Sequence, residues 1–167
     1  TFTQEVVEEM TRINERPIIF ALSNPTSQAE CDAEQAYQWS SGRALFACGS
    51  PFDPVPLNGK TFVPRQGNNS YIFPGMGLGA ITSGARHITD DMFMTAAHTL
   101  AHLVTESDLE QGSLYPALPR IREVSAHIAT AVADTAYKSG LAGKSRPQDV
   151  LADVQSQMYD PHYKSYI

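Results

Sequence analysis

The pattern of apolar and polar positions at the start of the chain predicts a helix followed by a buried strand. Val6, Val7, Met10 and Ile13 recur at helical spacing, and Thr3 precedes them as a candidate N-cap. Arg16-Pro17 predicts the end of this helix, because proline cannot continue one. The continuous apolar run at 18–22 is typical of a strand covered on both faces, as in a parallel sheet.

The next segments repeat this alternation. Residues 28–40 have a helical pattern, Gly42 interrupts it, and residues 43–48 form a second apolar run. Helix–strand–helix–strand is typical of an α/β doubly wound sheet. Since two strands do not make a stable sheet alone, we expect residues 1–48 to be the end of a larger Rossmann-like sheet.

The pattern changes near residue 68 from α/β alternation to helices only. Residues 49–71 read as loops, with a hairpin turn at Leu57-Asn-Gly-Lys60. Beyond them we predict helices, which fall at about 77–85, 89–105, 121–140 and 147–158. These patterns divide the chain into three parts. Residues 1–68 are the end of the domain that holds the sheet, residues 69–140 are helical, and residues 141–167 form a tail.

Composition narrows the classes of function. The 167 residues carry 12 Lys+Arg against 18 Asp+Glu, a net charge of −6, and no cluster of cations, which argues against nucleic-acid binding. No apolar run approaches the length of a membrane span. Charged residues make up 18% of the chain, below the roughly 25% of typical domains, so we expect much of its surface to contact other protein. Cys31 and Cys48 show no CxxC spacing and read as reduced, partly buried thiols.

Three asparagines are candidate binding residues. Asn24 directly follows the first predicted strand, and in open α/β sheets ligands bind beyond the carboxyl ends of strands. Asn68 and Asn69 lie in a polar loop at the predicted boundary. An amide offers a donor and an acceptor without charge. Pattern alone nevertheless favours ordinary turns at both places, since Asn-Pro and Gly-Asn-Asn-Ser are common turn sequences.

Other motifs have simpler structural interpretations. The GxGxxA match at 75–80 lacks a preceding strand and a following acidic residue, so we interpret it as a small-residue helix face for close packing. His98 and His102 are one helical turn apart but have no third metal ligand and no HExxH glutamate. Ser50 has no GxSxG context.

Taken together, these segments resemble the malic enzyme family. The resemblance runs through the whole chain in order and with matching spacing. It is carried by the stretches Arg16–Thr26 (RPIIFALSNPT), Gly42–Val55 (GRALFACGSPFDPV), Gln66–Gly79 (QGNNSYIFPGMGLG), Ile88–Asp90, Leu114–Leu118, Ile121–Ser125 and Met158–Tyr166.

This resemblance implies a function for the parent protein. Malic enzymes oxidise L-malate with NAD or NADP and a divalent metal, Mg2+ or Mn2+, and release pyruvate and CO2. The resemblance places Asn24 and Asn68 at both cofactor and substrate, and Asn69 at the substrate. The family's metal ligands, acid–base residues and Gly-rich phosphate turn have no counterpart in these residues, so we expect no catalytic residue or metal site here and no turnover by the chain alone.

Several alternatives remain open at this stage. A malolactic-type enzyme would convert malate to lactate, and a non-catalytic assembly module would use the helices and the Tyr-rich tail for subunit contacts. We expect the rest of a malic enzyme chain as a partner, a homo-oligomer (dimer or tetramer), and a cytoplasmic location, with a mitochondrial or plastid matrix as the alternative. The choice between NAD and NADP is not set by these residues.

Overall fold

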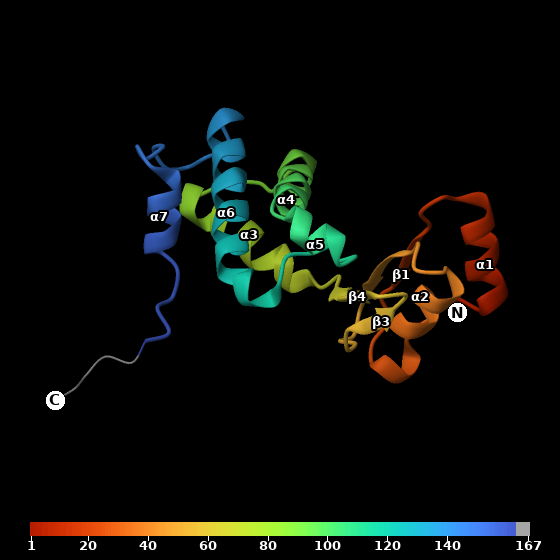
Figure 1. The fold of residues 1–167 in the computed structure, drawn as a ribbon. Helices are drawn as coiled ribbons and strands as arrows, with labels where there is room; N and C mark the ends of the chain where they lie inside the picture. The colour runs from red at the N-terminus through yellow and green to blue at the C-terminus, as the bar shows by residue number, and fades with distance from the viewer. Residues whose placement is uncertain (163–167) are drawn as a thin grey trace. The chain divides into compact units, whose positions relative to one another are not determined.

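A computed structural model describes residues 1–162 and shows two compact units (Figure 1). The first unit contains residues 1–71 and 100–121, and the second contains residues 72–99 and those from 122 onward. The first unit therefore takes its residues from two separate stretches of the chain. The division into domains at 68 and 140 stays a prediction.

The first unit holds all the strands that the described residues form. Its helices and strands are α1 (Gln4–Ile13), β1 (Ile18–Ala21), α2 (Ala33–Trp39), β2 (Leu45–Cys48), β3 (Val55–Leu57), β4 (Lys60–Phe62), β5 (Arg65–Gln66) and α5 (Glu106–Glu110). Short 3-10 turns lie at Thr26–Gln28, Asn69–Tyr71 and Leu118–Arg120.

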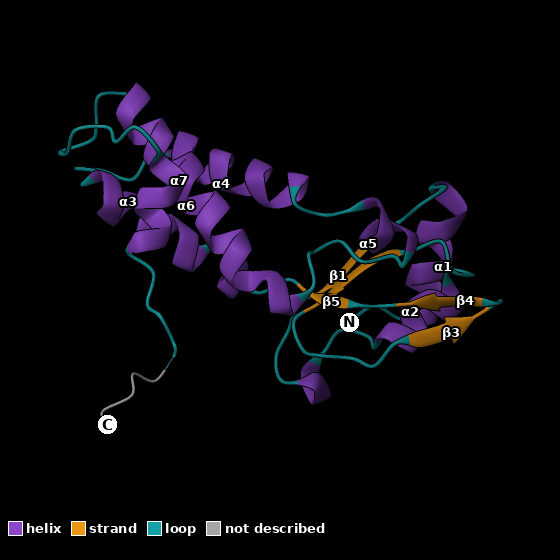
Figure 2. Cartoon of the chain, turned by 60° about the vertical axis from the view of Figure 1, so that its left-hand side comes forward, coloured by secondary structure: helices purple, strands orange, loops and turns teal. Residues whose placement is uncertain are grey.

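A parallel sheet with strand order β1-β2-β5 organises this unit (Figure 2). The parallel pair expected at 18–22 and 43–48 is confirmed, with Ile18 opposite Leu45. The two-residue strand β5 lies in the region read as loop, because a strand that short carries no periodicity. The predicted hairpin is also confirmed: β3 and β4 pair antiparallel, and Asn58 and Gly59 both have positive φ, as the tightest hairpin turns require.

Two expectations for this unit are wrong. The helix expected from residue 28 begins at Ala33, because Asp32 forms a capping box with Gln35 and residues 26–28 form a separate 3-10 turn. The strand β1 is not covered on both faces by the described residues: Ile18 is 60% exposed and Phe20 40%, while Ile19 and Ala21 are buried.

An aromatic cluster fills the core beside the sheet. Tyr37 stacks on Phe62 with ring centroids 4.3 Å apart, and it meets the edge of Phe46 at 5.7 Å. Cys31 and Cys48 lie in the same core and are free thiols, as expected. This core fixes the faces of β2 and α2, and with them the loops that leave the sheet.

Helices build the second unit, as the sequence predicts. They are α3 (Phe73–Ser83), α4 (Asp90–His102), α6 (Ile121–Lys138) and α7 (Val150–Ser156). The helix expected to reach Thr105 ends at His102, since Thr105 instead caps α5 in a box with Asp108. Gly140 has φ +70° just after α6, consistent with the predicted stop. In residues 1–162 no helix is both long and apolar enough to span a membrane.

The glycines of α3 allow it to lie close against α6. A Cβ on Gly75 would stand 2.7 Å from Ile128 Cβ, and one on Gly79 would stand 2.5 Å from the Ala129 carbonyl oxygen. Gly77 has open space around it. The interpretation of this glycine-rich stretch as a packing surface is confirmed.

Candidate functional site

The parallel sheet brings three loops to one edge. Because β1, β2 and β5 run in the same direction, their last residues Ala21, Cys48 and Gln66 end at the same side of the sheet. Asn24, Ser50 and Asn68 follow those ends by two or three residues. This is the edge at which open α/β sheets bind ligands.

Asn24 is exposed and is held by Ser50 in the loop that follows β2. Its amide oxygen accepts a hydrogen bond from Ser50 Oγ at 2.8 Å, and Ser50 itself is 3% exposed. Within the described chain, Asn24 Nδ2 makes no hydrogen bond. A side chain fixed at its acceptor and free at its donor is suited to bind a carbonyl or carboxylate oxygen of a ligand.

Asn68 is oriented in a similar way. Its Oδ1 accepts from the Ser70 backbone N–H at 2.9 Å, which identifies that atom as the oxygen and leaves Nδ2 as a donor without a described partner. Asn69 begins the 3-10 turn that follows, and both asparagines are exposed. Tyr71 anchors this loop by donating its hydroxyl to the Pro116 carbonyl at 2.6 Å.

Asn68 also lines a hollow that the sequence did not predict. Its volume is about 260 Å3, and its lining consists of Pro51, Phe52, Pro64, Arg65, Gln66, Asn68, Ser70, Tyr71 and Leu118. Asn24 and Asn69 are outside this lining. Arg65 is its one charged side chain among the described residues. Sequence reasoning missed Arg65 because β5 was not recognised as a strand, so nothing indicated that this arginine, three residues before Asn68, lines a hollow with it.

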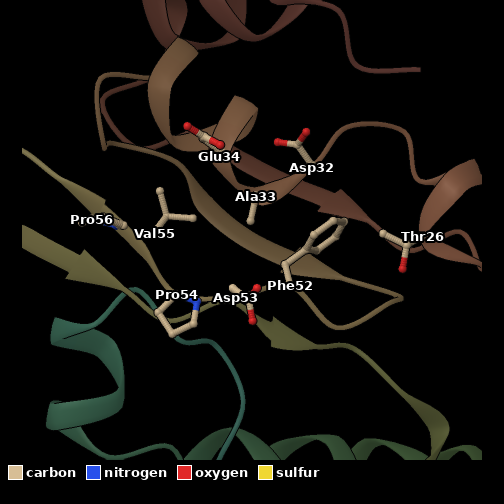
Figure 3. A pocket seen from close by; sticks show the side chains of 9 residues that line it. All are labelled: Thr26, Asp32, Ala33, Glu34, Phe52, Asp53, Pro54, Val55 and Pro56. Atoms are coloured by element: carbon tan, nitrogen blue, oxygen red, sulfur yellow. The ribbon is translucent and has the colours of Figure 1, made fainter.

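A larger hollow at the same side of the sheet has the opposite charge (Figure 3). Its volume is about 510 Å3, and Figure 3 shows carboxylates of Asp32, Glu34 and Asp53 around it. None of the candidate asparagines lines it. Carboxylates repel an anionic ligand, so the smaller hollow is the better site for a dicarboxylate or a phosphate despite its size.

The remaining candidates do not form a reactive site. Burial raises the pKa of Cys31 and of Cys48 to about 11, so both thiols stay protonated at neutral pH. His98 and His102 both lie on α4 and have interaction partners. Across residues 1–162 no three His, Cys, Asp or Glu side chains are placed to hold a metal ion.

Comparison with known proteins identifies the family. The family model "Malic enzyme, NAD binding domain" matches residues 1–137. The chain is 55% identical over 167 residues to NADP-dependent malic enzyme 1 of Arabidopsis thaliana, and 56% identical over 163 residues to the NADP-dependent malic enzyme of Dictyostelium discoideum. These matches include 99% and 98% of this chain, respectively, but only 29% and 30% of the two relatives. The chain therefore spans less than a third of their length.

Solved structures agree with this result. The malic enzyme of Entamoeba histolytica superposes with a TM-score of 0.73 at 26% identity, over 93% of this chain and 29% of that one. The enzyme of Pyrococcus horikoshii gives a TM-score of 0.68 at 30% identity, over 92% of this chain and 30% of that one. With its Rossmann-like sheet and its three asparagines in the matched region, the chain belongs to the malic enzyme family.

Proposed function

We propose that this chain is part of an oxidoreductase that converts L-malate to pyruvate and CO2 while reducing NADP+. The observation that carries the proposal is the 55% identity to a protein named NADP-dependent malic enzyme, which extends over 99% of the chain. The names of the relatives favour this activity over the malolactic alternative and favour NADP over NAD.

The three asparagines are assigned binding roles in this proposal. Asn24 and Asn68 contact both cofactor and substrate, and Asn69 contacts the substrate. The geometry fits: Asn24 and Asn68 each keep an amide donor free at the ligand-binding edge of the sheet. When bound, the cofactor supplies the hydride acceptor, and the residues of this chain orient what binds beside it. Neutral amides do so without adding repulsion to a dianion.

Metal, partners and location complete the proposal. The Mg2+ or Mn2+ ligands and the acid–base residues belong to the part of the relatives that this chain does not match. That part is also the proposed partner, which is supported by the exposed apolar side chains of Ile18 and Phe20 on β1 and of Leu22 directly after it. We propose a homo-oligomer in the cytoplasm, with an organelle matrix as the alternative, since the maize relative is named chloroplastic.

A chimera tests the activity. The 167 residues replace the matching segment of the Arabidopsis enzyme, and malate-dependent NADPH formation is measured together with pyruvate and lactate. We expect an active chimera that releases pyruvate. Asn24→Ala and Asn68→Ala should each lower kcat/KM about tenfold or more, because each removes a hydrogen bond to a charged or reacting group.

The matched control is Asn14→Ala. Asn14 is an exposed amide that follows α1 and precedes β1, so it lies on the amino-terminal side of that strand, away from the site. We expect this variant to keep the activity of the chimera. Release of lactate, or equal losses in the Asn14, Asn24 and Asn68 variants, would contradict the proposal.

A further inference from the structure

The loop at residues 24–29, which follows β1 and begins with Asn24, has few hydrogen bonds to the rest of the chain. Residues 24–28 are exposed, and the backbone hydrogen bonds that close the 3-10 turn stay within the loop itself. The one described hydrogen bond from this loop to another segment is the one between Asn24 and Ser50. An exposed loop that is held at one point can change the orientation of its side chains, so the restraint at its base matters.

Glu30 closes the base of this loop. Both donors of Ser23 are directed to its carboxylate: the backbone N–H donates to Oε2 at 3.2 Å, and the hydroxyl donates to Oε1 at 2.5 Å. Hydrogen bonds to a charged acceptor are stronger than those between neutral groups. Ser23 directly precedes Asn24, so the two hydrogen bonds fix the backbone from which the Asn24 side chain extends.

Glu30 is itself held by the core of the first unit. Its carbonyl accepts from the Phe2 N–H at 2.9 Å, the next residue Cys31 is buried in the core, and Asp32 then caps α2. The hydrogen bonds from Ser23 hold the pKa of Glu30 below its usual value, so at neutral pH the carboxylate is ionised and can only accept. Glu30 is therefore a fixed acceptor at the base of an exposed loop.

The side chain that meets Asn24 is also fixed. A Cβ on Gly49 would stand 2.0 Å from the Leu22 carbonyl oxygen, so the backbones after β1 and β2 are in close contact there. This contact sets the position of the next residue, Ser50, which is 3% exposed. Asn24 is thus restrained at two points, by Ser50 at the end of its side chain and by Glu30 through the preceding residue.

We propose that Glu30 is a positioning residue for Asn24 and acts on it through Ser23. The inference rests on the proposed function, which gives Asn24 contacts to cofactor and substrate. Glu30 lines neither the hollow of Asn68 nor the one in Figure 3, so we do not expect it to touch a ligand at either place. Its effect comes from orientation, because a small displacement of a group that orients a reactant lowers the rate strongly.

A double-mutant cycle in the chimera tests this role. Glu30→Ala removes the acceptor, and we expect kcat/KM to fall about fivefold while Asn24 is present. In the Asn24→Ala background the same change should alter kcat/KM by less than about twofold, because the group that Glu30 positions is already gone. Glu30→Gln keeps one acceptor oxygen for Ser23 and should restore most of the activity that Glu30→Ala loses.

A second measurement on the chimera needs no turnover. Hydrogen–deuterium exchange followed by mass spectrometry reports the backbone amides of Ser23 and of the loop. Glu30→Ala should speed exchange of the Ser23 amide about tenfold or more, because that N–H loses its acceptor. The matched control is Glu15→Ala, which removes an exposed carboxylate just before β1 and should change neither exchange of Ser23 nor kcat/KM.

Three results would overturn the proposal: no loss of kcat/KM in Glu30→Ala, an equal loss with and without the Asn24 side chain, or unchanged exchange of the Ser23 amide. The equal loss would show a general structural role for Glu30. An inactive chimera would instead argue against the proposed function, and the exchange of Ser23 would still decide whether Glu30 holds the loop of Asn24.

Discussion

At the scale of single residues, burial determines the chemistry of the ionisable groups in the first unit. Cys31, Cys48 and Tyr37 are at most 5% exposed. Burial raises the pKa of the Tyr37 hydroxyl as it does those of the two thiols. These groups fold in their neutral form and resist ionisation, which makes them parts of the core instead of reactive side chains.

Alkaline pH should therefore destabilise the chain. Each thiol ionises near its ordinary pKa of 9.0 when unfolded but at about 11 when folded. Their contribution to stability is complete below pH 9 and falls as the pH rises from 9 to 11, by up to about 1.4 kcal/mol per pH unit for each thiol. Urea unfolding at several pH values checks this slope.

The variant Cys48→Ala isolates one thiol in that experiment. It should be less stable at pH 7, where it loses packing, but its stability should fall less steeply between pH 9 and 11 than that of the unaltered chain. An unchanged slope would contradict the assignment of the effect to burial of Cys48.

At the scale of elements, the contact between α3 and α6 depends on glycine at particular positions. Gly75 and Gly79 occupy the contact face, one helical turn apart, whereas Gly77 occupies another face. The stretch has a sequence like that of a phosphate-binding turn, but its backbone is a helix throughout. Its glycines serve to shorten the distance between two helices.

Alanine substitutions at Gly79 and Gly77 should change the free energy of unfolding in opposite directions. Gly79→Ala places a Cβ 2.5 Å from the Ala129 carbonyl oxygen and 2.9 Å from Val132 Cβ, so we expect a loss of about 1–3 kcal/mol in the free energy of unfolding. Gly77→Ala meets nothing within 4 Å and should stabilise the helix by up to about 1 kcal/mol. Urea unfolding of the two variants measures both. Equal effects would show that the helix contact does not require glycine.

At the scale of the whole molecule, the chain matches less than a third of the length of its relatives. The described residues hold no cluster of metal ligands, and both thiols are buried and neutral. The matched relatives are more than three times as long. The residues of this chain are therefore expected to act together with the parts of a malic enzyme that it does not match.

The isolated chain should produce no NADPH from malate, with or without Mn2+. The spectrophotometric assay that detects the chimera checks this, and the chimera serves as the positive control for substrate, cofactor and metal. Malate-dependent NADPH formation by the purified 167 residues would contradict the expectation.

Local patterns in the sequence determined most helices, the strands at 18–21 and 45–48 and the hairpin, because periodicity, caps and turn residues act over a few neighbours. They also located Asn24, Asn68 and Asn69, while the roles of these residues came from family resemblance and remain proposals. Only the tertiary structure revealed β5 and the exposed face of β1, whereas the later start of α2 follows from the local capping box of Asp32 and Gln35, a signal that sequence reasoning overlooked. The tertiary structure alone formed the hollow that Arg65 and Asn68 line, since that hollow also needs Pro51 and Leu118 from distant parts of the chain and the pairing of β5 with β2.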